Sequence, residues 1–213
     1  MKLLVFISVA LFGASVRSNE DCPTACEECF CTEDPDGYLE IDCEDYREEA
    51  FPQCITHKVR SVSITRSEIT KLSPQDFVNA TALEVLRISE SPRLTVIEDG
   101  TFEETTSLQE ISITNCGLYS LPDELSRGLV NLTVLDLEHN AIKVLPYSWF
   151  DGTAIENLYL DDNRLDFLPQ GLFDNLPTLQ ILNLESNDMM ELPVSTLKKA
   201  TSLTHLWLSQ NPF

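Results

Sequence analysis

The cysteines are the residues of this sequence with the clearest potential for chemistry. Seven are present, and six fall in one N-terminal segment: Cys22, Cys26, Cys29, Cys31, Cys43 and Cys54. Their spacing, which starts Cys22-x3-Cys26-x2-Cys29-x-Cys31, would suit a zinc site in a reducing compartment and a disulfide framework in an oxidising one. Six cysteines allow many pairings, and the spacing does not choose among them. The compartment therefore decides which chemistry applies.

The first 18 residues indicate an exported protein. A basic residue follows the initial methionine, an apolar run covers residues 3–14, and small residues follow. This is the pattern of a signal peptide, with cleavage expected after Ser18 and cleavage after Ser15 as the alternative. A membrane anchor is disfavoured, because the run is shorter than the roughly 20 apolar residues that span a bilayer. Export favours disulfides over zinc.

Other residue types give little support for catalysis or for a metal site. The histidines lie far apart in the sequence, and the nucleophile, zinc-protease and phosphate-loop motifs are missing. Four carboxylates could offer oxygens to calcium, but they lack a calcium-loop motif and are better explained as a solvated face: Asp136, Glu138, Asp161 and Asp162. We expect no enzymatic activity, no cofactor and no metal.

Composition narrows the class of partner. The chain has 213 residues, of which 43% are apolar, enough for one domain with a core. It carries 35 acidic and 14 basic residues, a formal charge of −21. Binding to nucleic acid or to an acidic membrane is disfavoured, because the phosphate groups would repel this charge. No apolar stretch after the leader approaches membrane length, so we expect no membrane insertion of this chain.

A repeat of about 24 residues organises most of the chain. Units begin at residues 59, 83, 108, 132, 155, 179 and 203, and the last one is incomplete. The clearest unit starts Leu132-x2-Leu135-x-Leu137-x2-Asn140. Apolar residues two apart share one face of a short strand, and a single unit cannot bury them. Stacked coils can, so we predict a solenoid with a parallel sheet.

The ninth position of each unit explains the seventh cysteine. It holds short side chains where the chain leaves the strand: Ser67, Ser91, Cys116, Asn140, Asn163, Asn187 and Asn211. A buried turn at this place needs donors for unpaired carbonyl groups. We therefore interpret Cys116 as a member of this series, with a reactive thiol or an intermolecular bridge as the alternatives.

This pattern resembles the extracellular type of leucine-rich repeat. The resemblance rests on the L-x-x-L-x-L-x-x-N/C-x-L unit with a following Leu-Pro and Phe, over residues 59–213, and on the cysteines of residues 19–58, which resemble the N-terminal cap of such solenoids. It implies a curved α/β horseshoe with a parallel sheet on the concave face and irregular or short helical segments on the convex face. It also implies a Cys29–Cys43 disulfide and a bond from Cys31 to Cys22 or Cys26. Cys54 and the remaining cysteine exceed the usual four, which leaves their pairing open.

The last residues resemble the start of a C-terminal cap. Asn211-Pro212-Phe213 ends the sequence. A terminal cap normally covers the apolar end of a solenoid, so we expect that the natural protein continues beyond Phe213. The alternative is that a partner or a second copy covers this end.

We expect function on the concave face, where strand residues point away from the core. Its first strands carry Arg60, Arg66 and Arg87, and acidic residues concentrate on the fourth to sixth strands. The predicted contact residues for a basic or Arg-bearing protein or glycoprotein are Arg87, Asp136, Glu138, Tyr159, Asp161, Asp162, Glu185 and Trp207. The competing interpretation is a solvated acidic surface. Trp207 could also simply cover the open end.

Two sequons, Asn79-Ala80-Thr81 and Asn131-Leu132-Thr133, are candidate N-glycosylation sites away from the concave face. Three roles fit the sequence. The first is a secreted binding module in adhesion, immune recognition or the matrix. The second is the ectodomain of a single-pass receptor resembling the Toll group, at the cell surface. The third is a structural matrix component.

Overall fold

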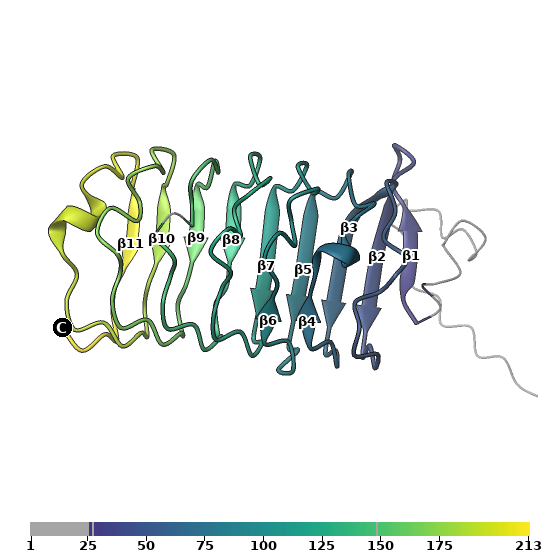
Figure 1. Ribbon diagram of the computed structural model, residues 1–213, viewed down its shortest axis with the longest axis horizontal. Coiled ribbons are helices and arrows are strands. Elements are labelled where there is room, and N and C mark those ends of the chain that lie inside the picture. Colours follow the sequence, from purple (N-terminus) through teal and green to yellow (C-terminus); the bar gives the residue numbers. More distant parts are fainter. Residues whose placement is uncertain (1–25, 27, 148) are drawn as a thin grey trace, which may run out of the picture.

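The computed structural model describes residues 26, 28–147 and 149–213, so the predicted signal peptide and Cys22 lie outside the described residues. Within them the chain is a solenoid of short strands joined by long loops (Figure 1). The elements are β1 Phe30–Glu33, β2 Leu39–Glu44, β3 Val59–Thr65, β4 Lys71–Leu72, η2 Pro74–Asp76, β5 Val85–Ser89, β6 Val96–Ile97, β7 Glu110–Thr114, β8 Val134–Asp136, β9 Asn157–Tyr159, β10 Ile181–Asn183, η3 Val194–Leu197 and β11 His205–Trp207.

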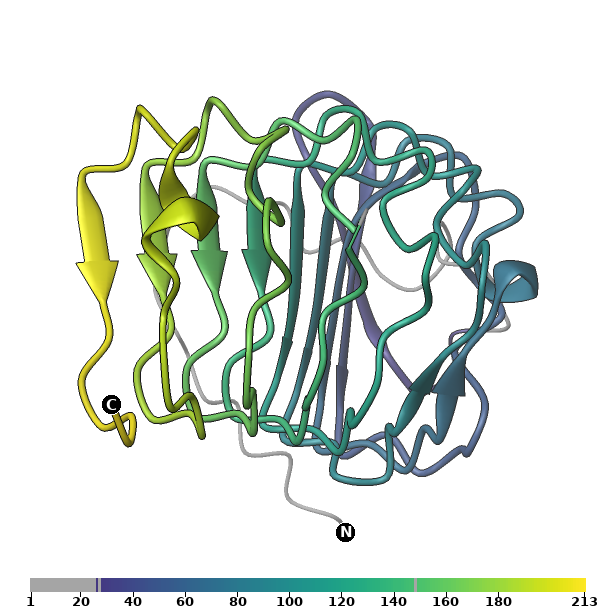
Figure 2. The ribbon, with the colours of Figure 1, turned by 60° about the vertical axis from the view of Figure 1, so that its left-hand side comes forward.

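One sheet of nine strands forms the concave wall of the solenoid. Its order is β1-β2-β3-β5-β7-β8-β9-β10-β11, and every pair after β1-β2 is parallel. Each repeat supplies one strand, which lies beside the strand of the next repeat (Figures 1 and 2). The predicted leucine-rich repeat solenoid is therefore confirmed.

The spacing of leucines accounts for the strands. Leu135 and Leu137 are almost fully buried, whereas Asp136 between them is only partly buried. Leu158 and Leu160 repeat this arrangement in the next turn. Each turn shares its leucines with both neighbours, and each fully buried leucine contributes roughly 1.5–3 kcal/mol before chain entropy opposes it.

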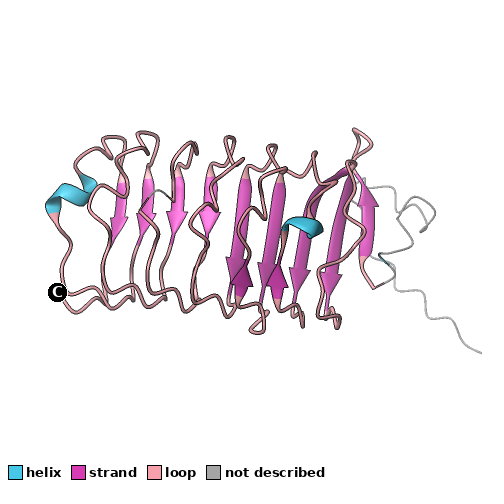
Figure 3. Ribbon diagram, in the orientation of Figure 1, coloured by secondary structure: helices cyan, strands magenta, loops and turns pink. Residues whose placement is uncertain are grey.

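The convex wall is mostly irregular. Its regular parts are the two-stranded sheet β4-β6 and the 3-10 helices η2 and η3, and the described residues contain no α-helix (Figure 3). Aromatic rings line its inner side. Phe77 lies between Phe51 and Phe102, with ring centroids 4.8 and 5.2 Å apart, and Phe150 contacts Phe173 at 5.8 Å. These rings fill the space between the two walls.

The cysteine-rich segment continues the solenoid. β1 and β2 form an antiparallel hairpin, and β2 pairs in parallel with β3 of the first repeat. Cys29 is bonded to Cys43, the pair implied by the resemblance, and Cys26 is bonded to Cys54. Cys31 is also disulfide-bonded. The hairpin thus covers the N-terminal end of the sheet, and the Cys26–Cys54 and Cys29–Cys43 disulfides join residues within the cap.

Candidate functional site

A ladder of side chains holds the concave strands in place. The Nδ2 of Asn163 donates to the carbonyl oxygens of Leu160 and Asp161 in its own turn and to that of Leu137 in the preceding turn, at 2.9–3.2 Å. Its Oδ1 accepts the N–H of Ile142 at 3.0 Å. Asn140, Asn187 and Asn211 make equivalent bonds. The ladder therefore links each turn to the preceding one at the end of the strand.

Cys116 is a member of this ladder, as predicted. Its Sγ lies 3.2 Å from the carbonyl oxygen of Thr114 and 3.9 Å from that of Ile88, and burial raises the pKa of the thiol to about 11. In the two preceding turns, the hydroxyl of Ser67 donates to that of Ser91 at 2.8 Å. The alternative of a reactive thiol is not supported, because a thiol with this pKa stays protonated near neutral pH.

The residue before each ladder position has an unusual backbone conformation that we did not predict. Its φ lies between 50 and 58° before all seven ladder positions, and Asp45, which follows β2 of the cap, shares the conformation: Asp45, Arg66, Glu90, Asn115, His139, Asp162, Ser186 and Gln210. Few side chains adopt this left-handed region readily. None of the eight is glycine, so the usual sequence signal is absent. This conformation turns the chain away from the strand at the edge of the concave face.

The strand register aligns three of the predicted contact residues, Asp136, Tyr159 and Trp207, and places Asn183 among them. Asp136 pairs with Tyr159, Tyr159 with Asn183, and Asn183 with Trp207. Tyr159 is partly buried, and Trp207 is 40% exposed, with its ring stacked on that of His205 at 5.6 Å between centroids. Aromatic side chains at such positions offer large contact areas. We call these four residues, Asp136, Tyr159, Asn183 and Trp207, the aligned row; they form the centre of the candidate surface.

Three carboxylates lie beside these four residues. We call the carboxylates the acidic row: Glu138, Asp161 and Glu185. Each comes two residues after a member of the aligned row. The pKa of Glu138 is raised, first by burial and then by the charges of Asp136 and Asp161. The pKa of Asp161 is raised by burial and by nearby carboxylates, and its Oδ1 is buried without a hydrogen-bond partner. Like charges on adjacent strands are destabilising.

Neighbouring charges extend the acidic row. Asp136 also has a raised pKa, mainly through burial, while its Oδ1 accepts the N–H of Glu138 at 3.2 Å. Asp162 is exposed, and its Oδ2 lies 3.5 Å from the Nδ1 of His139. Among the described residues, no lysine or arginine forms an ion pair with the acidic row. The negative charge there is therefore uncompensated within this part of the chain.

The arginines of the early strands behave differently. Arg87 makes two bonds to the carboxylate of Glu110, at 2.7 and 2.8 Å. Arg66 lies 2.8 Å from Asp45 and 2.5 Å from Glu44. Arg60 likewise binds acidic residues of the hairpin and stacks on Tyr38 at 4.0 Å. The sequence distinguished an Arg-bearing half from an acidic half, but the structure balances each of these arginines with carboxylates.

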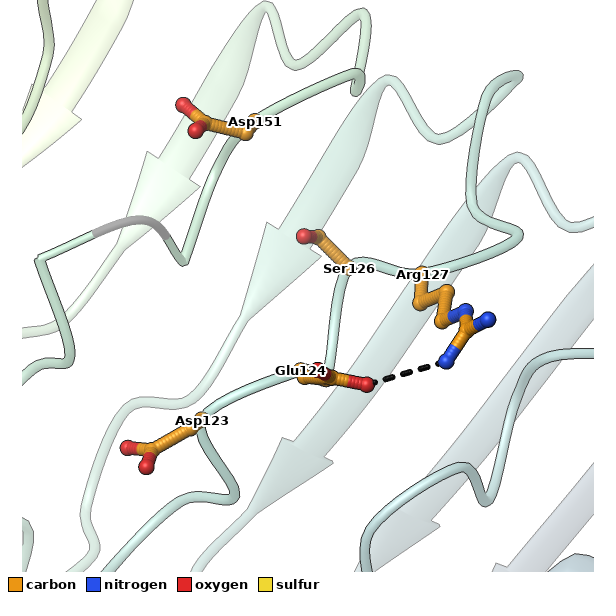
Figure 4. A pocket seen from close by; sticks show the side chains of 5 residues that line it. All are labelled: Asp123, Glu124, Ser126, Arg127 and Asp151. Atoms are coloured by element: carbon orange, nitrogen blue, oxygen red, sulfur yellow. Dashed lines mark hydrogen bonds and ion pairs between the residues drawn. The ribbon is translucent and has the colours of Figure 1, made fainter.

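The remaining candidates lie apart from this face or do not form a cluster. Within the described part of the chain, no group of three or more His, Cys, Asp or Glu residues is placed to hold a metal ion. A hollow of about 290 Å³ lies among loops at the side, where Arg127 bonds to Glu124 and Asp151 comes from the next turn (Figure 4). Both sequon asparagines, Asn79 and Asn131, are exposed.

Comparisons with known proteins agree with this geometry. Residues 57–118, 106–165 and 153–213 match the leucine rich repeat family. The chain is 23% identical to podocan-like protein 1 of Homo sapiens, over 95% of this chain and 43% of that protein. It is 28% identical to osteomodulin of Bos taurus, over 86% of this chain and 48% of that protein.

A shorter match is with leucine-rich repeat-containing G-protein coupled receptor 6 of Danio rerio, 34% identical over 44% of this chain and 10% of the receptor. The chain thus spans less than half the length of these relatives. Within the residues that the structure describes, no helix has the length and apolar character needed to cross a membrane.

Proposed function

The chain belongs to the leucine-rich repeat family, and from that premise we propose that it is an exported module that binds a protein or glycoprotein through its concave face. The partner presents basic side chains. The contact surface on this chain consists of the aligned row, from Asp136 to Trp207, the acidic row and Asp162. No catalysis is part of this role, since recognition needs only a rigid surface of suitable charge and shape.

The acidic row is the observation that carries the proposal. Glu138, Asp161 and Glu185 each lie two residues beyond the end of a strand in three neighbouring turns, and their repulsion destabilises the free protein. A cationic partner would relieve that repulsion, so part of the binding free energy would come from a cost already present in the unbound state. Complementary charge would also raise the association rate and disfavour acidic partners.

The aromatic residues of the aligned row supply the second component. Tyr159 lies between Asp136 and Asn183 in the register, and Trp207 lies at the next strand. An arginine of the partner could stack on such a ring while its guanidinium reaches a carboxylate. Burial of the rings would give affinity, and the acidic row would give selectivity.

Export and domain organisation complete the proposal. We propose a signal peptide over residues 1–18, a disulfide-rich cap over 19–58 and repeats over 59–213. The Cys26–Cys54 and Cys29–Cys43 bonds support an oxidising, extracellular location.

The second candidate is the ectodomain of a leucine-rich repeat receptor, which the match to the receptor of Danio rerio favours. The complete transcript separates the two candidates. A stretch of about 20 apolar residues encoded beyond residue 213 would support the receptor, whereas a stop codon after a cysteine-rich cap would exclude it.

Capture from extracellular fluid tests the binding proposal. The exported chain is compared with Asp161→Lys and with Asp99→Lys, an identical charge change at an exposed turn that follows β6 and lies outside the nine-stranded sheet. Basic proteins should be retained by the wild type and by Asp99→Lys, and lost from Asp161→Lys. Retention of the same proteins by all three would contradict a concave site.

A further inference from the structure

A second polar surface lies at the opposite end of the strands from the acidic row. It is an open hollow of about 420 Å³, lined by Glu84, Ser107, Gln109, Asn131 and Thr133. Glu84, Gln109 and Thr133 each come immediately before a strand, namely β5, β7 and β8. The hollow therefore lies at the edge of the nine-stranded sheet where these strands begin. Its lining offers amide and carboxylate groups that hydrogen-bond to sugar hydroxyls, while the hydroxyls of Ser107 and Thr133, which donate to the carbonyl oxygens of Thr81 and Gln109, can act as acceptors.

Asn131 combines this hollow with a sequon. It is exposed, and Thr133 completes the Asn-x-Thr motif. The Nδ2 of Asn131 donates to the carbonyl oxygen of Thr106 in the preceding turn at 2.8 Å. An amide nitrogen has two hydrogens, and this bond uses one of them. The other hydrogen is the one that a sugar would replace.

We propose that Asn131 carries an N-linked oligosaccharide whose first sugar rests in this hollow. The inference depends on the export proposed above. The donor is a polyprenyl-diphosphate-linked oligosaccharide of the secretory pathway. The Nδ2 of Asn131 forms a bond to the anomeric carbon of the first sugar, and the bond from that carbon to the diphosphate oxygen breaks. The polyprenyl diphosphate leaves with the electron pair, and one Nδ2 proton passes to solvent.

The remaining N–H of the substituted amide still donates to Thr106, so this bond orients the sugar. Ser107 and Gln109, from the preceding turn, line the hollow beside it. The acidic row begins two residues beyond the end of β8, whereas Asn131 lies three residues before β8 begins. An oligosaccharide on Asn131 therefore covers the flank and leaves the concave face open to a protein.

The modification is tested on the full chain, expressed with its own leader in a eukaryotic secretory host. Exported protein is treated with peptide N-glycosidase F in ¹⁸O water and digested, and the peptides are weighed. We expect labelled aspartate at position 131 in the wild type and in Thr133→Ser, which preserves the motif. The label should be absent from Asn131→Gln and Thr133→Ala. An exported wild type with unlabelled asparagine at 131 overturns the inference.

Failure of export would contradict the proposed function rather than this inference. In that case the same peptides are measured after expression with a heterologous leader. Labelled aspartate at position 131 would then support the inference, and unlabelled asparagine would overturn it. The two proposals can therefore fail separately.

The position of the sugar has its own test. In the Asn79→Gln variant, protein trimmed to a single sugar by an endoglycosidase is compared with protein exported in the presence of a glycosylation inhibitor, which keeps an unmodified Asn131 and creates no carboxylate. We expect the one-sugar protein to melt about 2–4 °C above the unmodified protein, because the sugar adds hydrogen bonds to the folded state. Equal melting temperatures would overturn the placement of the sugar in the hollow.

Discussion

The Sγ of Cys116 lies 3.9 Å from the carbonyl oxygen of Ile88 in the preceding turn, whereas the Nδ2 of Asn140 lies 2.7 Å from that of Ile113. The two distances measure the same link between neighbouring turns. A thiol is a weak donor with a single hydrogen, while an amide offers two strong donors. The ladder therefore joins neighbouring turns less firmly at Cys116 than at Asn140.

Replacement of Cys116 by asparagine should strengthen this link. We expect Cys116→Asn to raise the free energy of unfolding by about 1 kcal/mol, because one strong hydrogen bond replaces a weak contact. The melting temperature should rise by about 2–4 °C. Cys116→Ser is the matched control, since it offers one short donor and should give a smaller gain. A loss of stability in Cys116→Asn would show that the site lacks room for the amide.

The thiol of Cys116 should be inert in the folded protein. Its pKa of about 11 exceeds the ordinary value of 9.0, so the unfolded chain loses this proton at a lower pH than the folded chain. The contribution to stability is complete below pH 9 and is lost as the pH rises towards 11. At pH 8 we expect no reaction with a disulfide reagent until denaturant is added, when one thiol is released. Rapid reaction in the native state would contradict the buried ladder position.

The sequence predicted the features that depend on repeated spacing. Leu135 and Leu137 are two apart and recur with the repeat period, so their burial and the parallel sheet follow from one pattern. The contribution of β2 to the same sheet was not predicted. Its apolar residues also alternate, but Ile41 and Cys43 pair with residues only 21 positions later, Val62 and Ile64. Because this offset is shorter than the repeat period of about 24 residues, the repeat pattern does not include β2.

The charge balance of the concave face could not be read before the register was known. Arg87 and Glu110 are 23 positions apart, and only the pairing of β5 with β7 brings their side chains together. The left-handed residues were missed for another reason. Glycine usually marks this conformation, but here the ladder and the parallel strands impose it on residues such as Glu90 and Ser186.

Relief of this backbone strain should stabilise the protein. Glu90 has a φ of 51° and is exposed. The left-handed conformation costs an ordinary residue about 1–2 kcal/mol, and the flexibility of glycine in the unfolded chain offsets part of the gain. We expect Glu90→Gly to raise the free energy of unfolding by about 0.5–1 kcal/mol in denaturant titrations. Glu90→Ala removes the same charge but keeps the Cβ, so equal stability of the two variants would contradict this explanation.

Repulsion in the acidic row should make stability depend on pH. The raised pKa of Asp161 means that its neutral form suits the folded state, so its destabilising effect is present at pH 7 and fades as the pH falls through the carboxylate range. We expect Asp161→Asn to melt about 1–3 °C above the wild type at pH 7. The difference should largely vanish near pH 4. Asp99→Asn should show no difference at either pH, and an advantage of Asp161→Asn that persists in acid would exclude charge as its cause.

Binding through the concave face should depend on Trp207 without any change in stability. Its side chain is 40% exposed on β11, whereas the other tryptophan, Trp149, is 1% exposed in the core. We expect Trp207→Ala to abolish partner capture, and the pair Tyr159→Ala and Asp161→Lys to do the same, because anchor residues typically cost 2 kcal/mol or more of binding free energy, about 30-fold in affinity. The melting curve of Trp207→Ala should match that of the wild type within about 2 °C, since this exposed side chain lies away from the buried leucines. Fluorescence separates the two tryptophans: partner binding should shift the emission of the wild type to shorter wavelength, and Trp207→Phe should remove that shift while keeping the signal of Trp149. Unaltered capture by both variants would place the binding surface elsewhere, because it would show that the partner contacts neither the aromatic side chains nor Asp161.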